Sequence, residues 1–263
     1  MDAIDKAPIT ALITARDEAE VLGAALDSVA FCADVLLVDS GSTDATPEIA
    51  RAKGARVLEH PYESPARQKN WALPHCRFEW VLILDADEIV TPELAEELRR
   101  VVAAGPKADG YWIRRVNLFL GRPLKRGDWG RDTVIRLVAR DRARYQDRLV
   151  HEEIDLAGPL PTLRAPMLHD TFRSFDQYWP KVFRYADHGA RDMLRKGRRS
   201  GPAAIVGHPF WRFFRAYALR RGFLDGTHGL VAALLDGFTT YLKYARLWEL
   251  RRRGAAADAG EGR

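Results

Sequence analysis

Short apolar segments alternate with helical patterns through the first hundred residues, and this alternation leaves few possible folds. Between the apolar runs, apolar residues recur at the three- and four-residue spacing of amphipathic helices. Strands that alternate with helices form a mostly parallel sheet with right-handed crossovers. We therefore expect an α/β fold whose first strands cover Ile9–Thr14, Val35–Asp39, Arg56–Glu59 and Trp80–Asp87.

The fourth of these strands carries the strongest indication of a site. Its apolar run ends in two carboxylates, Asp85 and Asp87, separated by the small residue Ala86. Alternate residues of an extended chain lie on the same side, so we expect both carboxylates to point into one site. Ligands of open α/β sheets lie beyond the carboxyl ends of the strands, and paired carboxylates there favour Mg²⁺ or Mn²⁺. The structural alternative is a strand followed by an acidic helix cap.

The second strand also ends on a carboxylate, Asp39, which the turn Ser40–Asp44 follows. Gly41 permits unusual backbone angles in this turn, and Thr43 or Asp44 is suited to cap the next helix. The sequence contains neither a P-loop nor a glycine-rich dinucleotide fingerprint, which argues against NTPase and hydride-transfer functions.

The second half of the chain has a different texture, with two alternating strand patterns followed by helical ones. We divide the chain into a catalytic domain (residues 1–170), a basic and aromatic helical extension (residues 171–253) and a disordered tail (residues 254–263). The segments expected are strands at Gly110–Asn117 and Thr133–Val138, helices at Phe175–Lys196, Phe210–Tyr217 and Leu230–Trp248, and a flexible break at Gly197–Gly201.

Positive charge is concentrated in the helical extension. The chain carries a net charge of +5, but Lys181–Arg253 contains 16 Lys/Arg against 5 Asp/Glu, so this part carries +11 and the rest −6. Aromatic residues alternate with arginines at Phe210–Arg215, a composition typical of helices at an anionic membrane surface. The alternative is a helical lid with solvated arginines. With no secretion signal, membrane span or nucleic-acid motif, we expect a cytoplasmic protein, peripheral on the inner face of the cytoplasmic membrane, without a nucleic-acid partner.

Several motifs together resemble a known enzyme family. Leu36–Thr46 and Leu82–Asp87 resemble segments of inverting family 2 glycosyltransferases with the Rossmann-like GT-A fold, although members usually carry Asn where this chain has Asp17. Further segments resemble the lipopolysaccharide-core β-1,4-glucosyltransferase branch, namely Gln68–Asn70, Arg136–Leu137, Val150–Glu152, Leu168–His169 and Gly222–Gly226. The resemblance covers about residues 9–250. It implies a mixed, mostly parallel sheet with flanking helices and a C-terminal helical extension, and transfer of a hexose such as glucose from a UDP-sugar to a lipopolysaccharide-core or other glycolipid acceptor.

The resemblance also implies roles for individual residues. Asp39 would accept a hydrogen bond from the uracil, and Asp85 would lie near the ribose and the metal. Asp87 would ligate Mg²⁺ or Mn²⁺, with Asp85 as the second residue of the metal site. Capping alone remains the alternative for Asp39, and a first-turn helix acid remains the alternative for Glu18. Of Arg67 and Lys69, we expect one to reach the donor and the other to be solvated. The implied nucleotide-sugar site comprises Thr14, Arg16, Glu18, Asp39, Ser40, Gly41, Lys69, Asp85 and Ala86.

The general base of an inverting transfer must come from the second half of the catalytic domain. The Glu-Asp pair common in the superfamily is absent, so our candidate is Glu152, with Asp128 as the runner-up. His151 would orient the base or touch the diphosphate, and the alternative is a structural hydrogen bond between His151 and Glu152. His169 is a weaker candidate for contact with the diphosphate or the metal.

Two other functions remain open at this point, and the sequence argues against a third. One is the same donor chemistry with a polyprenyl phosphate or another surface polysaccharide as acceptor. Another is a catalytically inactive nucleotide- or glycan-binding module. The third, a nucleotidyltransferase, normally carries a glycine-rich basic loop after the first strand, and Ala15–Glu18 is not such a loop.

Overall fold

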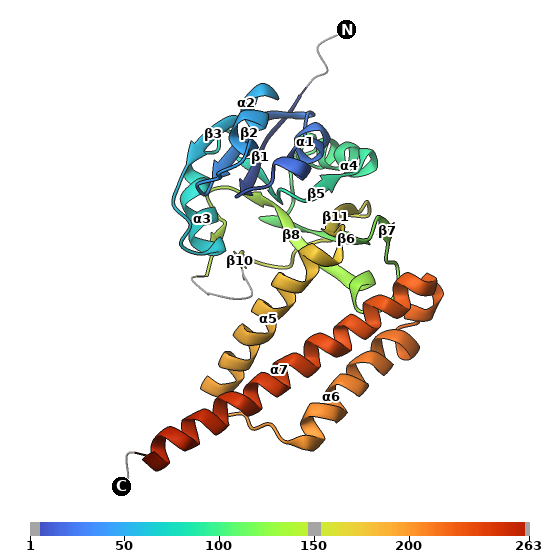
Figure 1. The fold of residues 1–263 in the computed structure, drawn as a ribbon. Helices are drawn as coiled ribbons and strands as arrows, with labels where there is room; N and C mark the ends of the chain where they lie inside the picture. The colour runs from blue at the N-terminus through green and yellow to red at the C-terminus, as the bar shows by residue number, and fades with distance from the viewer. Residues whose placement is uncertain (1–5, 147–153, 261–263) are drawn as a thin grey trace. The chain divides into compact units, whose positions relative to one another are not determined.

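The computed structural model of the protein describes residues 6–146 and 154–260, with side chains as far as residue 253. Within these residues a nine-stranded mixed sheet forms the framework (Figure 1). Its strands are β1 (Ala7–Ala15), β2 (Cys32–Asp39), β3 (Arg56–Glu59), β4 (Trp80–Asp85), β5 (Glu88–Val90), β6 (Gly110–Phe119), β7 (Arg122–Pro123), β8 (Asp132–Ala139) and β11 (Met167–Phe172). Their order is β3-β2-β1-β4-β8-β6-β11-β5, and β7 pairs with β6. A separate antiparallel pair is formed by β9 (Arg144–Tyr145) and β10 (Ile154–Asp155).

The first half of the sheet is parallel, as predicted. β1 lies between β2 and β4 and runs parallel to both, while β3 runs parallel to β2. The register pairs Ala15 with Asp39 and Thr14 with Asp85, so the two acidic strand ends reach the same edge of the sheet. The expected α/β architecture of a mixed sheet with flanking helices and a C-terminal helical extension is confirmed. The expectation that most of the sheet is parallel holds for its first half only, because β8 runs antiparallel to β4 and β6, β7 to β6, and β11 to β5. The connecting helices are α1 (Ala19–Ser28), α2 (Thr46–Ala52), α3 (Pro65–Ala72) and α4 (Pro92–Ala103).

Both faces of the central strands are buried. In β1, Ile9, Ala11 and Ile13 belong to one apolar cluster, whereas Leu12 belongs to another. The same alternation in β2 and β4 explains why these strands appear in the sequence as uninterrupted apolar runs. The carboxylates at the strand ends are therefore carried by strands that are packed on both faces.

The strand predicted for Trp80–Asp87 ends at Asp85, so the predicted extension through Asp87 is wrong. Ala86 and Asp87 form a turn, and Glu88 begins the separate strand β5, which pairs antiparallel with β11. The fully buried Glu88 side chain accepts a hydrogen bond from the Asp85 backbone N–H at 3.0 Å, which holds the turn closed. The two carboxylates consequently meet different partners.

The chain divides into two compact units. The first contains residues up to Val116 and Asp132–Asp170, and the second contains Asn117–Arg131 and the residues from Thr171 onward. The sequence had placed residues 117–131 inside the catalytic domain. They belong with the C-terminal helices because Phe119, Leu124 and Trp129 pack with Phe172, Tyr178 and Leu235.

The second unit is built on α5 (Phe175–Arg195), α6 (Pro202–Phe214) and α7 (Gly226–Gly260), and α7 packs against the other two helices. α6 begins eight residues before the predicted start at Phe210, because Gly207 and Pro209 conceal its first turns in the sequence. The tail predicted to be disordered from residue 254 is helical as far as Gly260, consistent with the high helix propensity of alanine. None of the helices in the described part of the chain is long and apolar enough to cross a membrane.

Candidate active site

The loop after β2 is organised by Asp39, which is almost completely buried. Its Oδ2 accepts hydrogen bonds from the backbone N–H groups of Gly41 (3.1 Å) and Ser42 (3.0 Å), and its Oδ1 accepts one from the Ser42 hydroxyl (2.5 Å). Gly41 adopts a φ of 80°, the left-handed region that glycine enters at least cost. The turn predicted from the sequence is therefore held by the Asp39 carboxylate, which accepts hydrogen bonds from two of its residues.

The loop after β1 is tied to this turn. Asp17, whose φ is 55°, accepts a hydrogen bond from the Thr43 N–H at 2.6 Å, and the Glu18 N–H donates to the Thr46 hydroxyl at 2.8 Å. The Ser40 N–H donates to the Ala15 carbonyl at 2.9 Å. These bonds bring Thr14, Glu18, Asp39, Ser40 and Gly41 of the predicted donor site to one edge. Arg16 lies there as well, but its side chain is mostly exposed beside Asp17.

Helix α3 places one of its two predicted cations at this edge. The Lys69 side chain is buried, and its Nζ lies 3.6 Å from Asp85 Oδ1 and 5.4 Å from the centre of the Tyr145 ring. Arg67, two residues earlier, lies on the exposed side of the helix and pairs with Glu63 at 2.6 Å. The neighbouring Gln68 donates to the Ser40 hydroxyl at 3.0 Å, which anchors α3 to the loop after β2.

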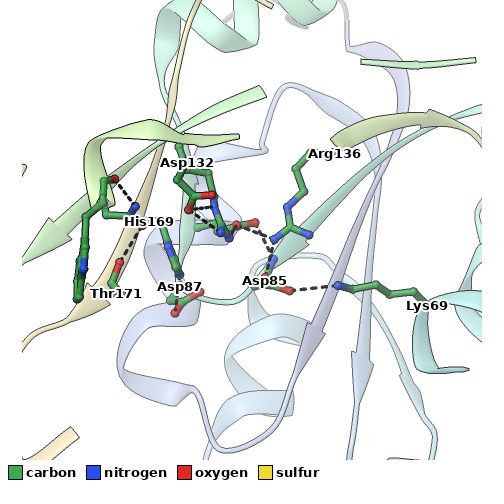
Figure 2. A network of polar contacts seen from close by, with 11 residues as sticks. Lys69, Asp85, Asp87, Asp132, Arg136, His169 and Thr171 are labelled. Atoms are coloured by element: carbon green, nitrogen blue, oxygen red, sulfur yellow. Dashed lines mark hydrogen bonds and ion pairs between the residues drawn. The ribbon is translucent and has the colours of Figure 1, made fainter. Parts of the chain in front are cut away.

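A chain of buried charges holds Asp85 (Figure 2). The Arg136 guanidinium, from β8, donates to Asp85 Oδ2 at 2.5 Å and to Glu88 Oε1 at 2.6 Å. Arg115, from β6, donates to the same Glu88 oxygen at 2.9 Å and to Asp132 at 2.8 Å. Burial alone would raise the pKa of Asp85, but the Arg136 and Lys69 cations outweigh it and hold the pKa of Asp85 well below its usual range. Asp85 is therefore an anion at neutral pH.

Of these partners of Asp85, Lys69 was predicted from the sequence to belong to the site, whereas Arg136 and Glu88 had no predicted role in it. Arg136 interrupts the otherwise apolar strand Asp132–Ala139, and a cation in a buried strand requires a buried anion. Glu88 directly follows the two aspartates and is completely buried. A charged residue inside an apolar strand is thus the feature of the sequence that indicates such a buried ion pair.

Asp87 occupies a different environment from Asp85. The pairing of β5 with β11 sets Glu88 opposite His169, and the Asp170 N–H donates to the Asp87 carbonyl at 2.9 Å. His169 Nε2 consequently lies 3.5 Å from Asp87 Oδ2 (Figure 2). Ala86 is buried in the turn between the aspartates. In the described parts of the chain, no three His, Cys, Asp or Glu side chains converge in a geometry that could hold a metal by themselves.

Of the candidates for the general base, the structure describes Asp128 but not Glu152. His151 and Glu152 lie outside the described residues. Asp128 belongs to the second unit, where its carboxylate is enclosed by Arg212 (2.9 Å), Arg215 (2.9 Å) and Arg220.

The first unit also contains a cavity of about 390 Å³ between α3 and the β9–β10 pair. The Asn70 side chain exchanges two hydrogen bonds with the backbone of Tyr145, both 2.8 Å long, and so fixes one wall of this cavity. Its lining residues are Arg67, Asn70, Arg144, Tyr145, Gln146 and Asp155.

Comparison with known proteins identifies relatives over nearly the whole chain. Residues 10–154 match the family model described as Glycosyl transferase family 2. An uncharacterized glycosyltransferase of Rickettsia bellii (strain RML369-C) is 30% identical, over 92% of this chain and 86% of its own length. The lipopolysaccharide core biosynthesis glycosyltransferase LpsC of Rhizobium meliloti (strain 1021) is 27% identical, over 97% of this chain and 98% of its own length. A crystal structure of glucosyl-3-phosphoglycerate synthase from Mycobacterium tuberculosis with Mn²⁺ and UDP-glucose is 22% identical, with a TM-score of 0.36, and the match covers 42% of this chain and 43% of that one.

Proposed function

The chain belongs to glycosyl transferase family 2, and from this premise we propose a specific reaction for it. The enzyme transfers a hexose, in our proposal glucose, from a UDP-sugar to a lipopolysaccharide-core acceptor with inversion at the anomeric carbon. The observation that carries the proposal is the acidic edge of the sheet, where Asp39, Asp85 and Asp87 stand on adjoining strand ends and loops. Nucleotides bind at such edges of open α/β sheets.

In this proposal the loops after β1 and β2 hold the nucleoside. Asp39 Oδ1 accepts from the Ser42 hydroxyl as its one donor among residues 6–146 and 154–260, and a carboxylate oxygen has a second lone pair for an N–H of uracil. Asp85, fixed by Arg136 and Lys69, accepts from the ribose. Because these groups are already positioned by protein contacts, donor binding requires little rearrangement of side chains.

Asp87 and His169 fit a divalent cation, Mg²⁺ or Mn²⁺. The Asp87 carboxylate lies on the turn after β4 and the His169 imidazole on β11, and their nearest atoms are 3.5 Å apart. The carboxylate is the ligand that such ions prefer, and they complete their shells with substrate phosphates and water. A bound cation supplies charge neutralisation of the departing diphosphate. Asp85 contributes negative charge nearby, but its oxygens face Arg136 and Lys69.

For the base we propose Glu152. The acceptor hydroxyl attacks the anomeric carbon, the bond from that carbon to the diphosphate oxygen breaks, and the carboxylate takes the hydroxyl proton. Asp128 is less suited to this role because three arginines occupy its carboxylate. A base must have an oxygen available at the moment of transfer.

For the acceptor we propose a glycolipid of the lipopolysaccharide core, presented at an anionic membrane surface. Support comes from the similarity to LpsC along nearly the full length of both chains. The excess positive charge of the helical unit also suits an anionic surface on the inner face of the cytoplasmic membrane.

The test is a transfer assay with the full chain. Purified protein is incubated with UDP-glucose, Mn²⁺ and core glycolipid extracted from a strain that lacks this gene, and the release of UDP is measured. We expect release that depends on both acceptor and cation and that stops on addition of a chelator. UDP-galactose, UDP-GlcNAc and GDP-mannose serve as matched donors, and faster turnover of one of these would overturn the assignment of glucose. Undiminished transfer in excess chelator would overturn the metal-assisted mechanism.

A further inference from the structure

The helical unit carries exposed apolar side chains on the side opposite a cluster of charged contacts. On α6, Arg212 pairs with Asp128 at 2.9 Å and lies 3.7 Å from Asp236 of α7. Trp129 Nε1 donates to the same Asp236 at 3.2 Å. Arg212 and Asp236 therefore both point to the side of the α6–α7 pair that carries Asp128.

Large apolar side chains of α6 and α7 lie on the side opposite Asp128. Two residues along an α-helix correspond to a rotation of about 200°. Phe210 and Phe214 each lie two residues from Arg212, and Leu234 and Phe238 each lie two residues from Asp236. All four side chains are exposed although they are large and apolar. They leave α6 and α7 on the side away from Asp128, which we call the open face.

Helix α5 extends the open face on the other flank of α7. The ring of Trp179 meets that of Phe238 at 6.0 Å, and Phe183 follows Trp179 by one helical turn. Phe183 is 54% exposed. The three helices thus form a layer whose open face carries exposed aromatic residues from each of them.

The charge pattern identifies what covers this face. Residues 193–224, which include α6 and the loops at both of its ends, contain eight Lys/Arg and no Asp/Glu. Arg212, Arg215 and Arg220 pair with Asp128 on the other side of the layer, so the five basic residues that remain lie near the ends of α6. At one end, Arg251 of α7 donates to the carbonyls of Arg198 (2.7 Å) and Gly197 (2.9 Å), which draws further arginines together at the edge of the layer. A second copy of the chain would bring equal positive charges into opposition, whereas anionic phospholipid headgroups would neutralise them.

We propose that the three-helix layer lies flat on an anionic phospholipid bilayer. The side chains of the open face enter the boundary between the headgroups and the acyl chains, and the arginines at the ends of the layer bind lipid phosphates. Such in-plane binding needs exposed aromatic and aliphatic side chains with basic flanks, and it does not need a spanning helix. This membrane docking rests on the proposed function in one respect, because it serves catalysis only if the acceptor is bound to the membrane.

The test compares two full-length variants in vesicle flotation. The first carries Phe183→Ser, Phe210→Ser and Phe214→Ser on the open face. The second carries Tyr185→Ser, which removes a side chain of similar exposure (57%) from α5 only two residues from Phe183 but on another side of the helix. Vesicles of phosphatidylglycerol and phosphatidylethanolamine are compared with vesicles of phosphatidylcholine alone.

We expect the wild-type protein and Tyr185→Ser to float with the anionic vesicles, and the triple variant to partition roughly 100-fold more weakly. Phosphatidylcholine vesicles should bind all three proteins weakly. Equal flotation of the triple variant and the wild type would overturn the proposal, and so would a wild-type dimer in light scattering that the triple variant abolishes. Thermal stabilisation by UDP-glucose and Mn²⁺, measured on each variant, keeps the two proposals separate. Its absence from proteins that still float would count against the donor chemistry and not against the docking face.

Discussion

Asp85 and Asp128 are both carboxylates held by guanidinium groups, yet their surroundings leave different chemistry available. The Asp85 side chain is 39% exposed, and the neighbouring Asp87 faces a histidine across a strand pairing. The Asp128 side chain is 6% exposed and is enclosed by three arginines. A carboxylate can serve a substrate only if some of its oxygen lone pairs remain accessible. The first region is thus organised as a site, whereas the second joins residues 117–131 to the helices.

The largest expected effect comes from removing Asp87, the second carboxylate of the first region. Asp87→Ala should reduce transfer by roughly 10⁴-fold, because the substitution removes the ligand proposed to hold the charge-neutralising cation. The fold should persist, since Asp87 makes no buried ion pair among the described residues except its contact with His169. Steady-state UDP release and circular dichroism measure the two effects. Turnover near the wild-type rate would remove Asp87 from the mechanism.

The identity of the base is the next test. Glu152→Gln should lower kcat by roughly 10³-fold with little change in UDP-glucose affinity, because only the proton acceptor is lost. Asp128→Asn is the matched variant and should retain kcat per folded molecule. Single-turnover kinetics with calorimetric donor titration separates chemistry from binding. If Asp128→Asn proved to be the slower enzyme, the base would be Asp128 in spite of its three arginines.

Removing the enclosed carboxylate should affect stability more than chemistry. Asp128→Ala leaves three arginines without their common anion, and breaking such a buried cluster costs about 3 kcal/mol of unfolding free energy. Asp27→Ala provides a control, since Asp27 forms a single exposed pair with Lys53 and should cost less than about 1 kcal/mol. Urea unfolding of both variants gives the comparison. Equal losses would mean that the Asp128 cluster is no more than a surface network.

The sequence predicted the parallel half of the sheet because each buried strand is marked by its own apolar run. It did not predict the turn at Asp87 or the place of residues 117–131. The turn depends on Glu88, whose side chain reaches back to the Asp85 backbone, and this contact leaves no periodic signal. Residues 117–131 join the helices through Phe119 and Trp129, which contact residues distant in sequence.

For the site, the motifs identified which carboxylates stand at the strand ends but not what holds them. Asp85 and Asp87 are two residues apart, and their spacing suggested a shared direction. Arg136 and His169, which distinguish the two, come from strands 51 and 82 residues beyond these aspartates. Only the pairings of β4 with β8 and of β5 with β11 bring them together.

The smallest expected effect is a difference in pH dependence between the two units. Burial would raise the pKa of Asp85, but the Arg136 and Lys69 cations lower it below its unfolded value, so its stabilising contribution is present at neutral pH and is lost only as the pH falls below about 4. Asp236 shows the opposite shift, because burial raises its pKa and Arg212 with the Trp129 hydrogen bond offsets only part of this.

The folded protein therefore binds a proton at Asp236 before the unfolded chain does, and Asp236 favours the folded state increasingly as the pH falls from 7 towards 4. Unfolding free energies of the wild type, Asp85→Asn and Asp236→Asn across this range test both signs, because asparagine does not titrate. The wild type should gain stability relative to Asp236→Asn as the pH falls, while its difference from Asp85→Asn stays constant until the pH nears 4. A wild-type curve parallel to that of Asp236→Asn would mean that Asp236 is as well solvated as an exposed carboxylate, and the helical unit would then lose the strongest sign that its charges are enclosed.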